Sequence, residues 1–120
     1  MSSAKRIMII DDDENIRTLL TDLLESNGFE VELAEDGLEG MEKLKSQSVD
    51  LILIDIRLPY VSGIGLVRIA KQHQPGTPII CMTGYGSSPE SIAEEECVGA
   101  VLSKPFKTQE LMDAIDRLLK

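Results

Sequence analysis

The stretch Leu51-Ile52-Leu53-Ile54-Asp55 decides the fold, because four consecutive apolar residues are followed at once by a carboxylate. A short run without a polar residue on either face is typical of a strand buried within a parallel sheet. Four further runs, two of them weaker, occur along the chain at residues 7–10, 31–34, 78–82 and 100–102. Together the runs predict five short strands.

The segments between these runs have the spacing of amphipathic helices. In residues 16–24 and 111–119, apolar side chains recur at steps of three and four, which is the helical period. Helix starts are predicted at four capping residues or pairs, of which Asp36 forms a capping box with Glu39: Asp13, Asp36, Ser62 and Ser88-Pro89. Strict alternation of strand and helix predicts a doubly wound α/β fold with helices on both faces of a five-stranded parallel sheet.

Length and charge narrow the function classes. The chain has 120 residues, which predicts a single domain over residues 1–120 with a core at about 5–119. Its formal net charge of −9 argues against direct binding to nucleic acid or to an anionic membrane, since both need clustered cations. The sequence shows neither a signal peptide nor a long apolar segment, and it has only two cysteines, so we expect a reduced, cytoplasmic protein.

Polar residues gather where the apolar runs stop. Asp11 and Asp12 follow the first run and Asp55 ends the third, while Thr83 and Lys104 follow the fourth and fifth. The carboxyl ends of parallel strands form the edge at which open α/β sheets bind ligands. A lone Asp after a strand is usually a helix cap, and we interpret Asp13 in that way. Four strands that each place a polar group at one edge indicate a functional site.

The chemistry of this set favours a hard divalent cation. Three carboxylates held close together repel one another unless they share a proton or bind a metal ion. Oxygen ligands without His or Cys select Mg²⁺ or Ca²⁺ over zinc. The Lys104 ammonium and the Thr83 hydroxyl would complete a set able to stabilise phosphoryl oxygens while a carboxylate attacks phosphorus.

Four motifs give the chain a specific resemblance. They are Ile9-Ile10-Asp11-Asp12, Asp55-Ile56-Arg57-Leu58-Pro59 with Ser62-Gly63, Met82-Thr83-Gly84 and Lys104-Pro105-Phe106. In the order and spacing of these motifs, the chain resembles the receiver domain of two-component response regulators over about residues 5–119. The resemblance implies a flavodoxin-like (βα)5 fold with strand order 2-1-3-4-5.

The same resemblance implies the role of each acidic residue. Asp55 would be the phosphoacceptor, taking a phosphoryl group from the phosphohistidine of a sensor kinase or phosphotransfer protein, or from a small phosphodonor. Asp11, Asp12 and Asp55 would hold Mg²⁺ together with the backbone carbonyl of Arg57. Asp12 would be a more direct metal ligand than Asp11.

The remaining motif residues would serve the phosphoryl group and the switch. Lys104 would pair with the phosphoryl group, and Thr83 would move toward it and pass the signal to the surface. The Lys104–Pro105 bond would be cis, which is typical of a defined turn. At the site of the family's switch aromatic, three residues before the lysine, the chain has Val101, so we expect coupling through Thr83 and movement of loops or helices.

Two bulky side chains would tune the lifetime of the phosphorylated state. Arg57 and Tyr85 match positions that flank the attacking water in receivers, so we expect slow hydrolysis of the aspartyl phosphate. A half-life of only seconds in Mg²⁺ buffer would contradict this. Separately, residues 94–96 are all Glu near the expected end of the fourth helix, where negative charge is unfavourable. They form either a solvated face or an acidic patch for a basic partner.

The expected function is therefore a phosphorylation-controlled switch that modifies only itself and is not an enzyme toward other substrates. Its surface of helix 4, strand 5 and helix 5 would meet a downstream protein or form a homodimer. With no output domain expected, any effect would pass through another protein. The alternatives are a docking module that works unphosphorylated, a phosphatase with an aspartyl-phosphate intermediate, and a flavodoxin-like cofactor carrier. The last two fit poorly, because Arg57 stands where such phosphatases carry a second acid and only 3% of residues are aromatic.

Overall fold

The computed structural model of the chain describes residues 4–58, 61–84 and 99–119. In chain order its elements are β1 (Arg6–Ile10), α1 (Glu14–Ser26), β2 (Glu30–Ala34), α2 (Gly37–Ser46), β3 (Leu51–Asp55), α3 (Gly63–His73), β4 (Ile79–Thr83), β5 (Ala100–Ser103) and α5 (Thr108–Leu119). The helix expected after Ser88-Pro89 and the acidic run at 94–96 lie outside the described residues. No helix in the described ranges is both long and apolar enough to cross a membrane.

The five strands form one parallel sheet in the order β2-β1-β3-β4-β5. This confirms the expected flavodoxin-like architecture and its strand order. The order reverses at β1, whose neighbours are β2 and β3, so the crevice at the carboxyl ends of β1 and β3 is the topological switch point. Ile10 pairs with Ile54, which brings the residues that follow, Asp11 and Asp55, to adjacent positions.

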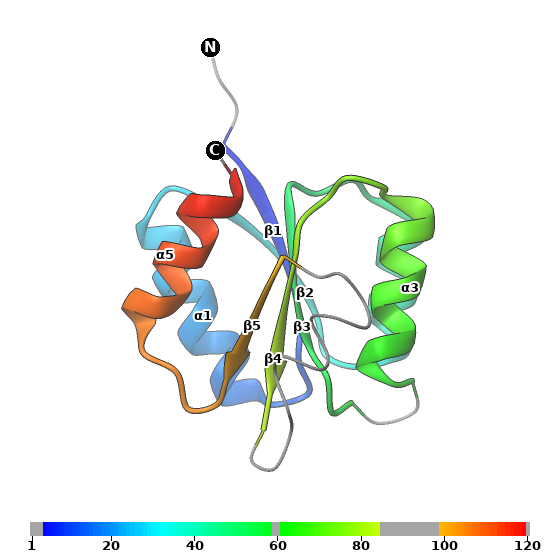
Figure 1. Ribbon diagram of the computed structural model, residues 1–120, viewed down its shortest axis with the longest axis horizontal. Coiled ribbons are helices and arrows are strands. Elements are labelled where there is room, and N and C mark those ends of the chain that lie inside the picture. The colour runs from blue at the N-terminus through cyan, green and yellow to red at the C-terminus, as the bar shows by residue number, and fades with distance from the viewer. Residues whose placement is uncertain (1–3, 59–60, 85–98, 120) are drawn as a thin grey trace.

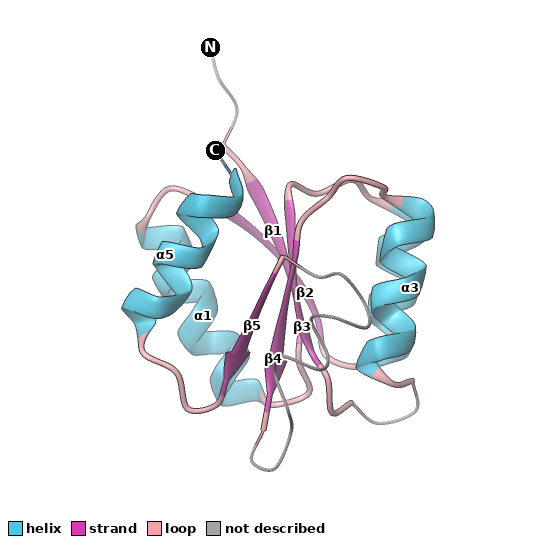
Figure 2. Ribbon diagram, viewed as in Figure 1, coloured by secondary structure: helices cyan, strands magenta, loops and turns pink. Residues whose placement is uncertain are grey.

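Helices cover both faces of the sheet (Figures 1 and 2). Alternate side chains of the strands point to opposite faces, so each face has a hydrophobic cluster of its own. Helices α1 and α5 pack on one face through Leu20, Leu24 and Leu111. Helices α2 and α3 pack on the other through Leu44 and Leu66. Every residue of β3 and β4 is buried, as expected for central strands of a sheet that is covered on both sides.

Local sequence sets the helix ends. Asp13 caps α1 by accepting hydrogen bonds from two backbone N–H groups, and Ser62 caps α3 in the same way from Gly65, which confirms both predicted caps. Asp36 caps α2 as predicted, but Glu39 accepts from the backbone N–H of Glu35 instead of completing the capping box on Asp36. Figure 1 shows α1 and α3 beginning at the end of the sheet where the arrowhead of β5 lies.

Candidate functional site: an acidic cluster joined by a lysine

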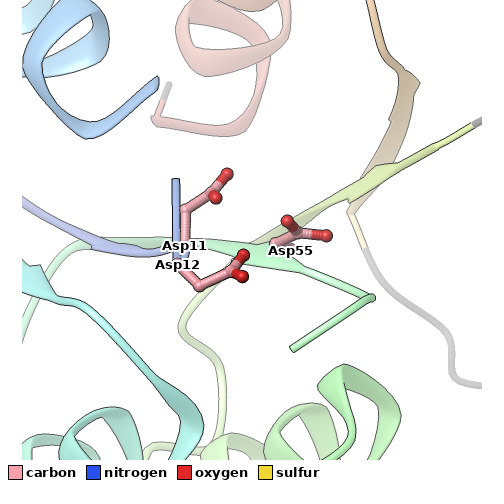
Figure 3. A group of neighbouring side chains, drawn as sticks. All are labelled: Asp11, Asp12 and Asp55. Carbon is pink, nitrogen blue, oxygen red and sulfur yellow. The ribbon is translucent and has the colours of Figure 1, made fainter. Parts of the chain in front are cut away.

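Three carboxylates meet at the switch point. Asp11 and Asp12 follow β1 directly and Asp55 is the last residue of β3 (Figure 3). One carboxylate oxygen from each of the three lies within 4.8 Å of the corresponding oxygens of the other two. Asp11 is fully buried and Asp55 is 6% exposed, whereas Asp12 is exposed. The cluster therefore has a buried floor and one carboxylate that faces the solvent.

Lys104 joins two of these acids from the other side of the site. Its Nζ donates a hydrogen bond to Asp11 Oδ2 at 2.9 Å and another to Asp55 Oδ2 at 3.0 Å. The second oxygen of each acid accepts from backbone, Asp11 Oδ1 from the N–H of Asp13 and Asp55 Oδ1 from that of Arg57, both at 2.9 Å. Each buried carboxylate thus receives one charged donor and one backbone donor, which is what a buried charge requires.

Burial and charge shift two pKa values within this network. Burial raises the pKa of Asp11 above its usual value of 3.8, aided by the negative charge of Asp55, and the hydrogen bonds from Asp13 and Lys104 offset only part of the rise. For Lys104, burial alone would lower the pKa, but its hydrogen bonds to both acids outweigh burial and hold the pKa above the usual 10.5. Lys104 is consequently a cation at neutral pH.

The donor set fits a divalent cation. Its ligating atoms are carboxylate oxygens, which Mg²⁺ prefers, and their mutual distances are short enough for one ion to contact them. One ammonium cannot neutralise three carboxylates, so the cluster retains a negative charge that a divalent ion would balance. Because Asp12 is exposed, an ion would reach the buried acids from solvent.

The structure brings Thr83 to the same edge, but the partner of its hydroxyl is the backbone of β5 and not one of the acids. Thr83 is fully buried, and its Oγ1 lies 3.5 Å from the backbone carbonyl of Leu102 in β5, to which it donates. The backbone N–H of Lys104 donates to the Thr83 carbonyl at 2.7 Å, so β4 and the loop that carries Lys104 are tied together. The Lys104–Pro105 bond is cis.

Three further residues were named from the sequence, and the structure describes two of them. The side chain of Arg57 is exposed, and Val101 is half-buried in β5 against the face that α2 and α3 cover. Tyr85 lies outside the described residues.

The start of α3 packs against the end of β3. A Cβ atom on Gly63 would lie 2.5 Å from Ile56 Cα and 2.6 Å from the Asp55 carbonyl oxygen. A backbone this close leaves room only for glycine, so Gly63 allows α3 to begin directly behind Asp55.

Sequence reasoning missed Arg17. This residue of α1 is half-buried, and its Nη1 donates a hydrogen bond to the backbone carbonyl of Asp11 at 2.8 Å. In the sequence, Arg17 is one of several charged residues on an amphipathic helix, and a backbone carbonyl as partner leaves no trace in the pattern of side chains. Its place one turn into the helix that begins at the acidic cluster does not distinguish it from other long cations on such a helix.

Comparison with known proteins identifies the family to which the chain belongs. Residues 7–116 match the family model of the response regulator receiver domain, which covers nearly the whole chain. The chain belongs to this family. It is thus a receiver domain of two-component systems, which confirms the resemblance drawn from the four motifs.

Individual relatives agree with the family assignment. The transcriptional regulatory protein GlrR of Escherichia coli is 36% identical over 95% of this chain, but the chain spans only 26% of that protein's length. A CheY-like receiver domain protein from Methanospirillum hungatei has a crystal structure with 36% identity and a TM-score of 0.91, covering 98% of this chain and 94% of that one. TrrA from Thermotoga maritima, solved in complex with Mg²⁺-BeF, has 31% identity and a TM-score of 0.86 over 96% and 99% of the two chains.

Proposed function

We propose that this receiver accepts a phosphoryl group on Asp55 and that phosphorylation switches a partner-binding surface. The observation that carries the proposal is the bridge from Lys104 to Asp11 and Asp55 within a cluster of three carboxylates. The bridge places a permanent cation on one oxygen of Asp55, at the position where added phosphoryl oxygens would need a positive partner. The family membership and the Mg²⁺-BeF complex of TrrA support the same interpretation.

In the proposed step, an oxygen of Asp55 attacks the phosphorus of a donor. With phosphohistidine as the donor, the new P–O bond forms as the P–N bond breaks, and the imidazole leaves. The Lys104 ammonium would exchange its hydrogen bond to the Asp55 carboxylate for one to a phosphoryl oxygen. The N–H of Arg57 would continue to donate to Asp55 Oδ1.

The residues proposed to hold Mg²⁺ are Asp11, Asp12, Asp55 and the backbone carbonyl of Arg57. When bound, the ion would neutralise developing charge on the phosphoryl oxygens. The reacting carboxylate of Asp55 is itself nearly buried and is bonded to the half-buried Lys104, which limits the access of water to it. We also propose that the side chains of Arg57 and Tyr85 slow hydrolysis of the aspartyl phosphate.

The response would begin at Thr83. Its hydroxyl is hydrogen-bonded to the Leu102 carbonyl, and we propose that it turns toward the phosphoryl group once Asp55 is modified. Because Thr83 and Lys104 are tied through the backbone, this movement would reach β5 and the surface beside α5. With Val101 in β5 in place of an aromatic residue, the movement itself would transmit the signal.

We further propose that residues 1–120 act as one receiver unit in the cytoplasm, that the donor is a sensor histidine kinase or phosphotransfer protein, and that the output is a second protein or a homodimer. The unit would not bind nucleic acid directly and would modify only itself. A receiver that docks a partner without being phosphorylated is the competing function, and the following experiment separates the two.

The test is incubation with acetyl phosphate and Mg²⁺, followed by intact-mass measurement. We expect one phosphoryl group on the wild type and none on Asp55→Asn, since the amide has no nucleophilic oxygen anion. Asp113→Asn removes an exposed carboxylate on α5 that is not a member of the cluster, and this variant should be phosphorylated as the wild type is.

Two outcomes would contradict the proposal. Phosphorylation that persists in Asp55→Asn would place the acceptor elsewhere. A wild type that stays unmodified with both acetyl phosphate and a phosphorylated kinase domain would favour the docking module.

A further inference from the structure

Arg17 is a cation beside the acidic cluster that bonds to none of its carboxylates in the contacts described. Its Nη1 donates to the backbone carbonyl oxygen of Asp11 at 2.8 Å, and its own backbone N–H donates to the Asp13 carbonyl at 3.0 Å. Lys104 differs, because its ammonium bonds directly to Asp11 Oδ2 and Asp55 Oδ2. The two cations therefore act on different parts of the site.

The carbonyl that Arg17 binds belongs to the peptide unit that links Asp11 to Asp12. Two other bonds hold this turn, from the backbone N–H of Asp11 to the Ala34 carbonyl at 3.2 Å and from the N–H of Asp13 to Asp11 Oδ1 at 2.9 Å. Neither of them fixes the plane of the Asp11–Asp12 peptide. The bond from Arg17 does, and the direction of that plane decides where the Asp12 side chain leaves the backbone.

We infer that Arg17 is a positioning residue for the metal ligands Asp11 and Asp12. This inference rests on the proposed function, in which these acids hold Mg²⁺. By anchoring the carbonyl, the guanidinium sets the direction of the Asp12 side chain beside Asp11 and occupies no carboxylate oxygen that a metal would need. The backbone that carries this guanidinium is itself held in place, because Arg17 lies in the second turn of α1, whose first turn is capped by Asp13.

Positioning and simple electrostatics predict opposite results when Arg17 is replaced. A positive charge close to a cation site repels the cation, so removing it should strengthen Mg²⁺ binding if charge alone matters. If Arg17 positions the ligands, its removal should weaken Mg²⁺ binding despite the lost repulsion. Substitution of groups that orient metal ligands typically costs about 10–100-fold in affinity, which is large enough to decide the sign.

The experiment is a calorimetric Mg²⁺ titration of the unphosphorylated wild type, Arg17→Met and Arg17→Lys, with amide NMR shifts of residues 11–13 as a second readout. We expect Arg17→Met to bind Mg²⁺ about tenfold more weakly. Arg17→Lys keeps the charge but loses the planar fork of donors, and it should lie between the two. In both variants the unbound shifts of residues 11–13 should change while those of β3 and β4 remain.

Arg117→Met is the matched control, because Arg117 also donates to a backbone carbonyl, that of Gly99, but at the far end of α5. It should bind Mg²⁺ as the wild type does. Unchanged or tighter binding in Arg17→Met would overturn the inference and leave the proposed function intact. A wild type that does not bind Mg²⁺ would instead refute the proposed metal site itself. If Arg17→Met does not fold, Arg17→Lys decides, since equal affinity to the wild type would contradict positioning.

Discussion

At the scale of single residues, the buried carboxylate of Asp11 lowers the free energy of unfolding of the metal-free protein when it is charged. This carboxylate is fully buried and close to Asp55, and burial above all raises its pKa over the usual 3.8. The folded protein therefore binds this proton more tightly than the unfolded chain does. It follows that, without metal, the contribution of Asp11 to the free energy of unfolding falls as pH rises from 3.8 to its folded pKa. Above that pKa the full cost is present.

We accordingly predict that Asp11→Asn stabilises the metal-free protein at neutral pH by about 1 kcal/mol, a common size for a single substitution. The amide removes the buried charge and its repulsion with Asp55, while Lys104 keeps one partner in Asp55. Urea unfolding in a chelator, at neutral pH and near the usual carboxyl pKa, would measure the effect, and the gain should shrink at the lower pH. Asp113→Asn serves as the exposed control. A loss of stability at neutral pH would mean that the ion pair with Lys104 outweighs the burial cost.

At the scale of elements, the outer edge of β2 is protected by one lysine. β2 is an edge strand, and because Glu30 and Ala34 bond to β1, the carbonyl of Leu33 faces away from the sheet. Lys43 of α2 donates to this carbonyl and pairs with Glu32 at 2.8 Å. Lys43 thus brings a cation to the open side of an edge strand, where positive charge discourages pairing with another chain.

We predict that Lys43→Met promotes self-association through β2. Loss of the ammonium frees an edge carbonyl and leaves an apolar side chain beside it, so a second copy can pair along the strand. Sedimentation velocity at rising concentration would detect the larger species. Lys45→Met changes the same charge at an exposed position of the same helix and should stay as the wild type. Equal self-association of the two variants would show that Lys43 does not prevent pairing along the β2 edge.

The elements also show which structural features the sequence could predict. The apolar runs placed all five strands, and Asp13 and Ser62 capped the expected helices, because strand burial and caps depend on residues close in the chain. The convergence of Asp11, Asp12 and Asp55 followed from strand order. Arg17 and Lys43 could not be foreseen, since both bind backbone carbonyls and any long cation on a helix has the same local pattern.

At the scale of the whole molecule, the formal charge of −9 complicates any test of metal binding. Every cation screens the mutual repulsion of an acidic chain, so Mg²⁺ would raise its stability even without a site. Specific binding adds a separate contribution, which grows with the ratio of free ion to dissociation constant and reaches about 2.7 kcal/mol at a hundredfold excess. Only the specific part depends on which carboxylate is present.

We therefore predict that Mg²⁺ raises the unfolding midpoint of the wild type more than NaCl of equal ionic strength does, and that Asp12→Asn abolishes the difference. Asp12 is the exposed member of the cluster, so its amide should fold normally while removing a metal ligand. Asp22→Asn changes the net charge by the same unit at an exposed position of α1 and should keep the response to Mg²⁺. If all three proteins respond alike, screening of the whole acidic surface explains the stabilisation, and the three carboxylates at the switch point do not act as a Mg²⁺ site.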